Sequence, residues 1–438
     1  MSLWIGLMFL SLILMLLMGY PVAFTLGSVA LLYGSIFLGI DFFRLLPLQI
    51  WGVMTNFTLL AVPLFILMGI ILDKSGLAED LLETMGQLFG RVRGGLAISV
   101  VLVGALLAAT TGVVGATVVT MGVIALPTML KRHYSPQLAC GTIAASGTLG
   151  QIIPPSIVLI LLGDVIGVPV GRLFIGAVVP GMILVTLFLV YISVYAWLRA
   201  EAAPALAVDE NDKGLGNKVI FTLLPPLLLV LGVLGSIFFG IASPTESAAI
   251  GAIGAMMLAA AHKRLSLENL QQAMQQTTRL TSMVFMILIG ATAFGLVFRG
   301  MGGASLVRDL MLNLPGGEWG FLAVSMGLIF LLGFFLDFLQ ICFIVVPILQ
   351  PIAQELRIDL LWLAVLIGIN LQTSFLTPPF GFSLFYLKAV APAQITIQHI
   401  YKGILPFVAI QVLVILLLLF FPQTVLWLPN LMDKWHGL

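Results

Sequence analysis

LGQIIPPSIVLI, residues 149–160, is the stretch from which the fold of this chain can be worked out. Two adjacent prolines interrupt an apolar run that is otherwise suited to crossing a membrane. A proline inside a helix removes a backbone hydrogen bond and costs about 3 kcal/mol, and lipid offers no partner to the carbonyl groups that are freed. The stretch FLTPPFGFSLFY, residues 375–386, repeats the same interruption. Both interruptions therefore call for a structural or functional reason.

The composition places the chain in a membrane. Of its 438 residues, 61% are hydrophobic and only 8% are charged, whereas soluble domains carry about 25% charged residues. A spanning helix needs about 20 apolar residues, and several uncharged runs are longer than that: residues 1–40, 94–130, 133–163, 173–198, 219–245, 360–387 and 403–432. We therefore predict an all-α, polytopic integral membrane protein.

Several other classes of protein are disfavoured by the sequence. The first apolar run lacks a basic start and continues to residue 40, which is unlike a cleavable signal peptide. The formal net charge of +1 gives no indication of a nucleic-acid partner. Cys140 and Cys342 are far apart in apolar settings, so we expect two small buried side chains rather than a disulfide or metal framework.

Similar stretches recur in the same order on either side of a polar linker, residues 199–218. The segment around Pro21 resembles the segment around Pro244, and three further pairs follow at a nearly constant offset. These pairs are Gly69 with Gly290, Pro127 with Pro347, and the prolines at 154–155 with those at 378–379. A duplicated membrane unit with a broken helix in each half is typical of transporters. We predict two inverted repeats whose broken helices form two related binding sites; a simple proline kink is the alternative.

A second interrupted element precedes each proline pair. Residues 94–130 contain the small-residue stretch AATTGVVGAT and can form either two full spans or a re-entrant hairpin. Residues 319–351 are the counterpart, with Gly333 and Asp337 at the centre. Asp337 and Thr117 precede matching prolines by the same distance, so the two hairpin tips are predicted to correspond.

Asp337 is the sole acid between Glu318 and Glu355. A carboxylate at membrane depth is costly and therefore indicates function. Three roles remain open from the residue alone: ligation of sodium, transport of a proton, or pairing with a neighbouring donor. An intramembrane aspartyl enzyme is a competing class, but it needs a second acid at similar depth. The first half offers only Thr117 at the corresponding position, so we predict that the chain is not an enzyme.

Polar residues gather just before each break. The residues before the second proline pair are Asn370, Gln372, Thr373, Ser374 and Thr377, and those before the first are Thr142, Ser146, Thr148 and Gln151. We predict that five of them, Ser146, Thr148, Asn370, Thr373 and Ser374, contact the substrate, although hydroxyl groups in membrane helices often bond back to their own helix.

Two other polar features have simpler interpretations. SPTE, residues 243–246, is typical of a helix start with a capping box, which favours a structural role for Glu246. Residues 77–94 and 265–280 are amphipathic and are expected to form interfacial or connecting arms.

Many ordered motifs together resemble the large membrane subunit of tripartite ATP-independent periplasmic (TRAP) transporters. They are GYPVAF, LAVPLFILMGIIL, RVRGGLAISV, GTLGQIIPPSI, RLFIGAVVPG, SPTESAA, LDFLQICFIVVPIL, LTPPFGF and a final VLWLP, and they cover essentially the whole chain. The resemblance implies a symporter of the bacterial or archaeal inner membrane, driven by sodium and working by an elevator mechanism. It also implies a small membrane subunit and a periplasmic binding protein that delivers an organic anion, usually a carboxylate. The variant LQTSFLTPPFGFSLFYLK resembles a branch linked to 2-oxo acids and aromatic acids.

The resemblance also implies two sodium sites, each between a hairpin tip and a break. The implied ion-binding residues of the first site are Thr110, Thr111, Gly112, Gly150, Ile153 and Pro154, and those of the second are Gly333, Asp337, Thr377, Pro378 and Gly381. The substrate would lie between the two tips. Most family members have an aspartate where this chain has Thr117, so the ligands of the first site are expected to differ.

The expected organisation has six parts. Scaffold helices with an arm occupy residues 1–93 and 219–317, and the transport-domain hairpins with their broken helices occupy 94–170 and 318–392. A connecting helix with the polar linker (171–218) and a C-terminal helix (393–438) complete the chain. A stand-alone sodium- or proton-coupled anion symporter of related elevator fold is the alternative within transport.

Overall fold

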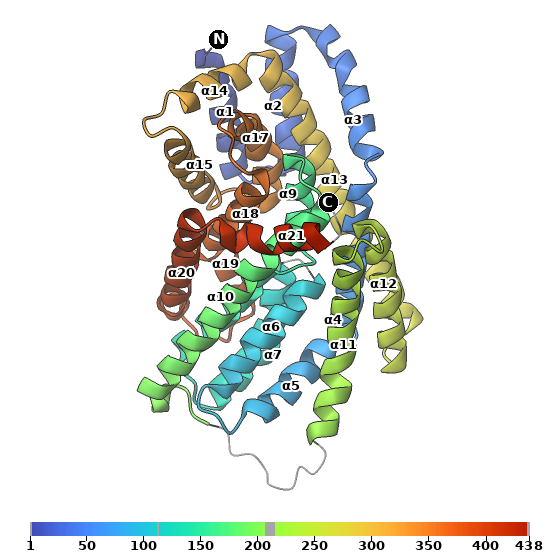
Figure 1. Ribbon diagram of the computed structural model, residues 1–438, viewed down its shortest axis with the longest axis vertical. Coiled ribbons are helices and arrows are strands. Elements are labelled where there is room, and N and C mark those ends of the chain that lie inside the picture. Colours follow the sequence, from blue (N-terminus) through green and yellow to red (C-terminus); the bar gives the residue numbers. More distant parts are fainter. Residues whose placement is uncertain (1, 112–113, 206–214, 436–438) are drawn as a thin grey trace.

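The computed structural model describes residues 2–111, 114–205 and 215–435, and all regular secondary structure in these residues is helical (Figure 1). The α-helices of the first half are α1 (Ser2–Leu17), α2 (Val22–Phe37), α3 (Leu46–Met54), α4 (Ala61–Lys74), α5 (Leu77–Phe89), α6 (Gly95–Thr111), α7 (Val114–Lys131), α8 (Pro136–Thr148), α9 (Ile157–Ile166) and α10 (Val170–Leu198). Those of the second half are α11 (Leu215–Phe238), α12 (Pro244–Ala261), α13 (Leu267–Gly300), α14 (Gly303–Leu312), α15 (Glu318–Leu332), α16 (Phe338–Gln340), α17 (Val346–Glu355), α18 (Leu360–Leu376), α19 (Phe382–Val390), α20 (Ile397–Phe420) and α21 (Gln423–Trp435). Five short helices of other kinds join them: η1 (Ile40–Leu45), η2 (Thr58–Leu60), η3 (Leu149–Gln151), η4 (Ala200–Ala202) and the π-helix η5 (Ile341–Val345).

The described residues contain seven helices that are long and apolar enough to cross a membrane. A bent pair, Ile40–Met54 with Thr58–Lys74, makes eight if it is counted as one span. The polytopic all-α prediction is therefore confirmed. Cys140 and Cys342 are both buried free thiols, as expected.

The same order of elements occurs in both halves of the chain: a hairpin, a broken helix and a long helix. The first half has the hairpin of α6 and α7, then α8, η3 and α9, then α10. The second half has the hairpin of α15 to α17, then α18 and α19, then α20. Figure 1 places α6 and α7 toward one end of the long axis and α15 and α17 toward the other. The inverted relation of the two halves stays a prediction.

The two helices of the first hairpin (hairpin 1), α6 and α7, are longer than helices that span only half of a membrane. Helices α6 and α7 have 17 and 18 residues, and at 1.5 Å per residue each is about 25 Å long. Helix α7 alone has the length and composition of a span. The tip of this hairpin includes Gly112, which lies outside the described residues.

The two predicted arms differ from one another. The first is a separate amphipathic helix, α5, as expected. The second is not separate, because residues 267–300 form one helix, α13, of 34 residues. No glycine or proline occurs between Leu267 and Ile289 to end the helix. A short amphipathic helix, α14, instead precedes the second hairpin, which comprises α15 to α17 and is called hairpin 2 below.

The predicted capping box at the start of α12 is confirmed. The Ser243 hydroxyl accepts a hydrogen bond from the Glu246 amide at 3.3 Å, and the Glu246 carboxylate accepts one from the Ser243 amide at 2.8 Å. These bonds satisfy two donors that a helix start leaves without partners. Glu246 therefore has a structural reason to be acidic.

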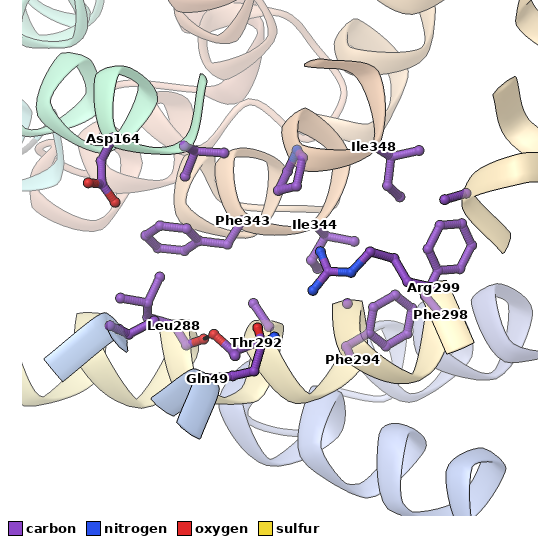
Figure 2. Close-up of a pocket in the computed structure, with 16 residues that line it drawn as sticks. Gln49, Asp164, Leu288, Thr292, Phe294, Phe298, Arg299, Phe343, Ile344 and Ile348 are labelled. Atoms are coloured by element: carbon purple, nitrogen blue, oxygen red, sulfur yellow. Dashed lines mark hydrogen bonds between the residues drawn. The ribbon is translucent and has the colours of Figure 1, made fainter. Parts of the chain in front are cut away.

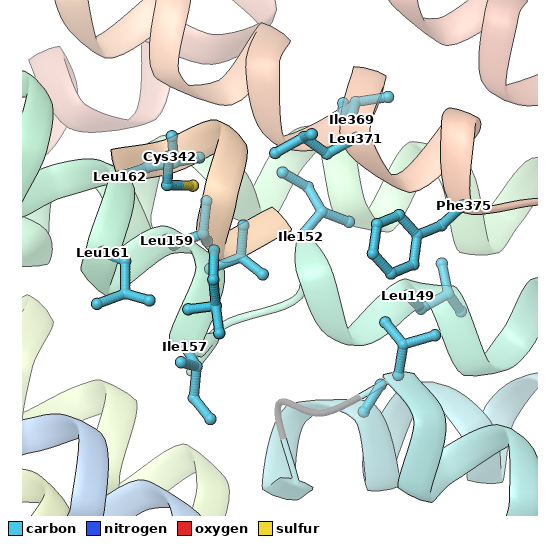
Figure 3. Packing of buried hydrophobic residues seen from close by; sticks show 14 of the residues in the cluster. Leu149, Ile152, Ile157, Leu159, Leu161, Leu162, Cys342, Ile369, Leu371 and Phe375 are labelled. Carbon is cyan, nitrogen blue, oxygen red and sulfur yellow. The ribbon is translucent and has the colours of Figure 1, made fainter. Parts of the chain in front are cut away.

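Helices α8 and α18, which precede the two breaks, are almost completely buried. Every residue of α8 from Leu138 to Thr148 is buried, and so is every residue of α18 from Leu361 to Leu376. Figure 3 shows apolar side chains of the first break, such as Ile152, close to side chains of α18, such as Phe375. A Cβ atom on Gly368 of α18 would lie 3.4 Å from Cδ1 of Ile152. The first break is thus packed against α18.

Candidate functional site

The first break separates α8 from α9, and a serine side chain forms hydrogen bonds with its backbone groups. Helix α8 ends at Thr148, and α9 begins after the N-cap residue Ser156. The Ser156 hydroxyl donates to the carbonyl oxygen of Gln151 at 2.9 Å and accepts from the Leu159 amide at 3.5 Å. One side chain therefore satisfies a carbonyl group inside the break and a free amide of the following helix.

In the second break, a serine likewise satisfies a free carbonyl group. Helix α18 ends at its C-cap, Thr377, and the Ser383 hydroxyl in α19 donates to the Phe375 carbonyl oxygen at 2.8 Å. A Cβ atom on Gly381 would lie 2.6 Å from that same oxygen, so only glycine fits this turn. Both breaks contain a cis peptide bond between their two prolines.

Ser156 and Ser383 were not among the predicted site residues. The sequence does carry a signal for them, because a serine follows each proline pair within four residues. Such a serine can bond to the backbone groups that a break leaves free.

Each hairpin packs against the break of its own half, as predicted. In the first half, a Cβ atom on Gly150 would lie 3.3 Å from the carbonyl oxygen of Ala108, near the end of α6. In the second half, Gly333 ends α15 and leaves no room for a Cβ atom beside the Ser374 side chain. The side chains of Thr110 and Thr111 lie outside the described residues, as does Gly112.

Asp337 lies at the tip of hairpin 2, where the sequence predicted it. It is half-buried and caps α16, since its Oδ1 atom accepts a hydrogen bond from the Phe338 amide at 2.7 Å. Thr117 is a buried residue of α7, and its correspondence with Asp337 stays a prediction. The π-helix η5 follows Asp337 and changes the helical register on that side only.

The five predicted substrate residues are all buried, and each already has a backbone partner. Ser146, Thr148, Thr373 and Ser374 donate to carbonyl oxygens of their own helices at 2.8 to 3.0 Å. Asn370 donates to the carbonyl oxygen of Met326, in α15, at 2.7 Å. The hydroxyl oxygens of Ser146, Thr373 and Ser374 keep the capacity to accept a hydrogen bond, and substrate contact by the five residues stays a prediction.

Thr148 is the centre of a buried polar cluster that joins polar residues predicted before the two breaks to Gln411, which was not predicted. Its hydroxyl oxygen accepts from the amide of Gln372 at 3.3 Å and from the amide of Gln411 at 3.4 Å. Among the described residues, the amide oxygens of both glutamines have no partner, and both amide atoms of Gln151 are likewise buried without one. Gln411 comes from α20, far along the chain from either break, so no local pattern could have indicated it.

The start of the polar linker holds the base of hairpin 1. The Gly94 amide donates to the Ala203 carbonyl oxygen at 3.0 Å, and the Ser135 amide donates to that of Ala202 at 2.8 Å. The Tyr134 hydroxyl accepts from the Leu96 amide at 3.3 Å, and burial raises the pKa of Tyr134. Three hydrogen bonds therefore stabilise the base of the hairpin.

Comparison with known proteins identifies the family. Residues 9–424 match the family model described as "Tripartite ATP-independent periplasmic transporter, DctM component". The chain is 32% identical over 403 residues to the C4-dicarboxylate TRAP transporter large permease protein DctM of Pseudomonas aeruginosa, with 91% of each chain covered. It is 29% identical to the sialic acid TRAP transporter large permease protein SiaM of Vibrio cholerae, with 98% of this chain and 97% of that one covered.

A solved structure shares the fold. The YdaH transporter of Alcanivorax borkumensis superposes with a TM-score of 0.63 over 98% of each chain, at 14% sequence identity. At that identity the likeness concerns the fold alone. The family match over nearly the whole sequence and the spanning helices lead to one conclusion: the chain belongs to the DctM family of large permease subunits of TRAP transporters, which are multi-pass proteins of the bacterial inner membrane.

Proposed function

We propose that this chain is the permease of a sodium-driven secondary transporter that imports an organic carboxylate by an elevator motion. The observation that carries the proposal is the pairing of each hairpin with a broken helix, through Gly150 with Ala108 and through Gly333 with Ser374. Non-helical backbone at membrane depth is tolerated only where it is buried in protein or lines a cavity. Breaks of this kind supply carbonyl oxygens and helix ends to ions and substrates in secondary transporters.

Sodium is the proposed coupling ion, carried together with the substrate. Carbonyl, hydroxyl and carboxylate oxygens are hard ligands that suit such a cation. The second site would use the backbone of Thr377, Pro378 and Gly381 together with Gly333 and the Asp337 carboxylate. Asp337 fits this role because its capping bond uses one lone pair of Oδ1 and leaves the other carboxylate acceptor sites available.

The first site has a weaker set of side-chain ligands. It would use the carbonyl groups of Gly150, Ile153 and Pro154 and the tip residues Thr110, Thr111 and Gly112. Thr117 replaces the acid expected there and is buried within α7. This site would therefore depend mainly on neutral oxygens, and we expect it to hold its ion less tightly than the site at Asp337.

The moving part would comprise residues 94–170 and 318–392, and residues 1–93 and 219–317 would form the scaffold. In support of this division, α18 of the second half packs against α8, η3 and α9 of the first half. The connecting segment 171–218 and the C-terminal segment 393–438 contact each other through the rings of Phe188 and Phe407, whose centroids are 5.1 Å apart.

The partners follow from the family. A small membrane subunit would enlarge the scaffold, and a periplasmic binding protein would deliver the anion. Relatives are named for C4-dicarboxylates and sialic acid, which supports an organic acid as the substrate class. We expect a 2-oxo acid as the first compound to test.

Uptake into proteoliposomes tests this function. The vesicles would contain this chain, its small membrane partner and the matching binding protein, with and without an inward sodium gradient. Uptake of a 2-oxo acid that requires both the gradient and the binding protein would support the proposal. Uptake with the gradient alone would instead indicate a stand-alone symporter, and uptake driven only by a proton gradient would contradict sodium coupling.

A further inference from the structure

Exposed basic residues gather at the base of hairpin 1, where residues 91–95, 131–135 and 199–203 meet. The hydrogen bonds from the amides of Gly94 and Ser135 to carbonyl oxygens of the third segment hold the three together. In Figure 1 the end of α5, the base of α6 and α7 and the end of α10 lie toward the same end of the long axis. The exposed basic residues, which we call the basic patch, are Arg91, Arg93, Lys131, Arg132 and Arg199. The three segments contain a single acid, Glu201.

The side chains of the basic patch are not neutralised by acids. Among the described residues, no carboxylate forms an ion pair with any of them, whereas Arg172, Arg264 and Arg308 each pair with an acid. The guanidinium carbon of Arg199 lies 5.7 Å from the centre of the Tyr195 ring, a contact that keeps the positive charge. The patch is therefore available to an external anion.

Helix ends explain only part of this charge. Helix α7 ends at Lys131 and α10 ends one residue before Arg199, and the C-terminal end of a helix favours a cation. Arg93 is different, because it lies two residues before the first residue of α6. The N-terminal end of a helix disfavours a cation, so this arginine requires another reason.

The base of hairpin 2 has the opposite charge. Residues 308–318 and 355–359 contain two basic residues and four acids. Arg308 is also paired there, since its Nε atom donates to Glu355 at 2.7 Å. Short cytoplasmic loops carry the excess of lysine and arginine, so the difference between the two bases predicts that the base of hairpin 1 faces the cytoplasm. The cytoplasmic leaflet has a negative surface potential.

Exposed apolar side chains are interleaved with the basic ones. Val92 separates two of the arginines and is 51% exposed. Trp197 and Leu198 directly precede Arg199 and are 76% and 67% exposed. Tryptophan is enriched at the membrane–water interface, and arginine and lysine can lay their stems along apolar groups while the charge stays at the headgroups. This mixture suits a phospholipid better than a soluble anion.

Arg299 shows the contrast between an isolated arginine and the patch. It too has no ion pair among the described residues, and apolar side chains such as Phe298 and Ile344 lie beside it in Figure 2. No second lysine or arginine is among the described residues that line this cavity of about 260 Å³. Clusters of about four to eight basic residues bind anionic lipids, and the basic patch has this size while Arg299 stands alone.

We propose that the basic patch binds the phosphate headgroups of anionic phospholipids in the cytoplasmic leaflet. Arginine forms bidentate pairs with phosphate oxygens, and lysine acts as a point charge. The exposed apolar side chains beside the patch would contact the acyl chains. The inference depends on the membrane location of the chain and needs neither sodium coupling nor an elevator motion.

Thermal unfolding of the full chain with its small membrane partner, in a neutral detergent, tests the binding. The melting temperature is measured at increasing concentrations of phosphatidylglycerol and, separately, of phosphatidylcholine with the same acyl chains. Phosphatidylglycerol should raise the melting temperature further, because a ligand that binds the folded state stabilises it. The excess should shrink at high salt, which screens exposed charges.

Two double variants identify the residues responsible: Arg91→Gln with Arg93→Gln, and Lys131→Gln with Arg132→Gln. Each removes two charges from the patch. Each should therefore raise the phosphatidylglycerol concentration for half-maximal stabilisation by about tenfold or more.

The matched control is Arg308→Gln with Arg357→Gln, which removes two exposed basic residues from the base of hairpin 2. It should leave the phosphatidylglycerol concentration for half-maximal stabilisation unchanged. Each protein is compared with its own lipid-free melting temperature, so a change in basal stability does not enter the comparison.

Thiol labelling tests which leaflet the patch faces. The variant Val92→Cys provides a reporter, because the two native cysteines are buried. A membrane-impermeant maleimide should label it in inside-out vesicles and not in right-side-out vesicles. Leu310→Cys should give the reverse result, since Leu310 is 62% exposed in α14, next to the base of hairpin 2.

The inference is overturned if both lipids stabilise the protein equally, if both patch variants respond to phosphatidylglycerol as the parent does, or if Val92→Cys is labelled only in right-side-out vesicles. None of these measurements involves uptake. A failure of sodium-driven transport would therefore leave the lipid site intact, and a failure of lipid binding would leave the proposed transport function intact.

Discussion

The Asn56 side-chain amide donates a 2.6 Å hydrogen bond to the Asp164 carboxylate and so joins the segment between α3 and η2 to α9. Asn56 belongs to the proposed scaffold and Asp164 to the proposed moving part. If the two parts slide past each other, this contact exists in only one state of the transport cycle.

A cross-link at this contact should stop transport. In the variant Asn56→Cys with Asp164→Cys, a short bifunctional thiol reagent should abolish uptake, and reduction of a cleavable reagent should restore it. The variant Lys74→Cys with Gln272→Cys is the control, because these side chains are hydrogen-bonded at 3.0 Å between α4 and α13, both in the proposed scaffold. Full uptake by the cross-linked Asn56–Asp164 variant would contradict the elevator proposal.

Replacement of Asp337 should separate its charge from its capping role. Asparagine caps helices about as well as aspartate, so Asp337→Asn should keep the melting temperature. Its sodium-driven uptake should nevertheless fall by about tenfold or more, because a charged ligand is lost.

Asp337→Ala loses the cap as well and should also melt at a lower temperature. Both quantities can be followed in the same preparation, by thermal unfolding and by uptake at varied sodium concentration. Parental uptake and sodium dependence in Asp337→Asn would remove this carboxylate from the ion site.

The capping box of α12 should be structural. Ser243→Ala should destabilise the protein by about 1 kcal/mol, the usual cost of a lost N-cap. Glu246→Gln should have little effect on stability, because glutamine can also close a capping box, and its uptake should equal that of the parent. Unfolding in denaturant and uptake assays check both variants, and a loss of uptake in Glu246→Gln with unchanged stability would assign Glu246 a functional role.

Gln411→Met should be neutral or stabilising. The change removes one long hydrogen bond, at 3.4 Å, and also a buried amide oxygen that has no protein partner. An unsatisfied buried polar group costs about 1–3 kcal/mol, which outweighs the typical gain from one hydrogen bond. Melting temperatures of the two proteins provide the measurement. A clear decrease in Gln411→Met would mean that the oxygen is satisfied by a bound water or ion.

Local features of the sequence were sufficient to locate several of the main elements. The proline pairs at 154–155 and 378–379 located both breaks, because proline cannot continue a helix. The SPTE stretch located the start of α12, since capping depends on residues only three positions apart. Gly333 and Asp337 located the tip of hairpin 2.

Other features depend on more than a local pattern. Thr117 was matched to Asp337 by counting back from a proline, and this match stays a prediction, since the π-helix η5 follows Asp337 in the second hairpin. The amphipathic stretch 265–280 was expected to form an interfacial or connecting arm, and its helix continues into the adjoining apolar segment without interruption.

The sequence by itself determined that the chain crosses a membrane many times and that two of its helices are broken, because hydropathy and proline act within a few residues. Only the tertiary structure decided which groups meet: Gln411 beside Thr148, and Asn56 beside Asp164. Those contacts join segments that are far apart in the chain. Their partners are selected by shape and burial across the whole fold, which no local pattern specifies.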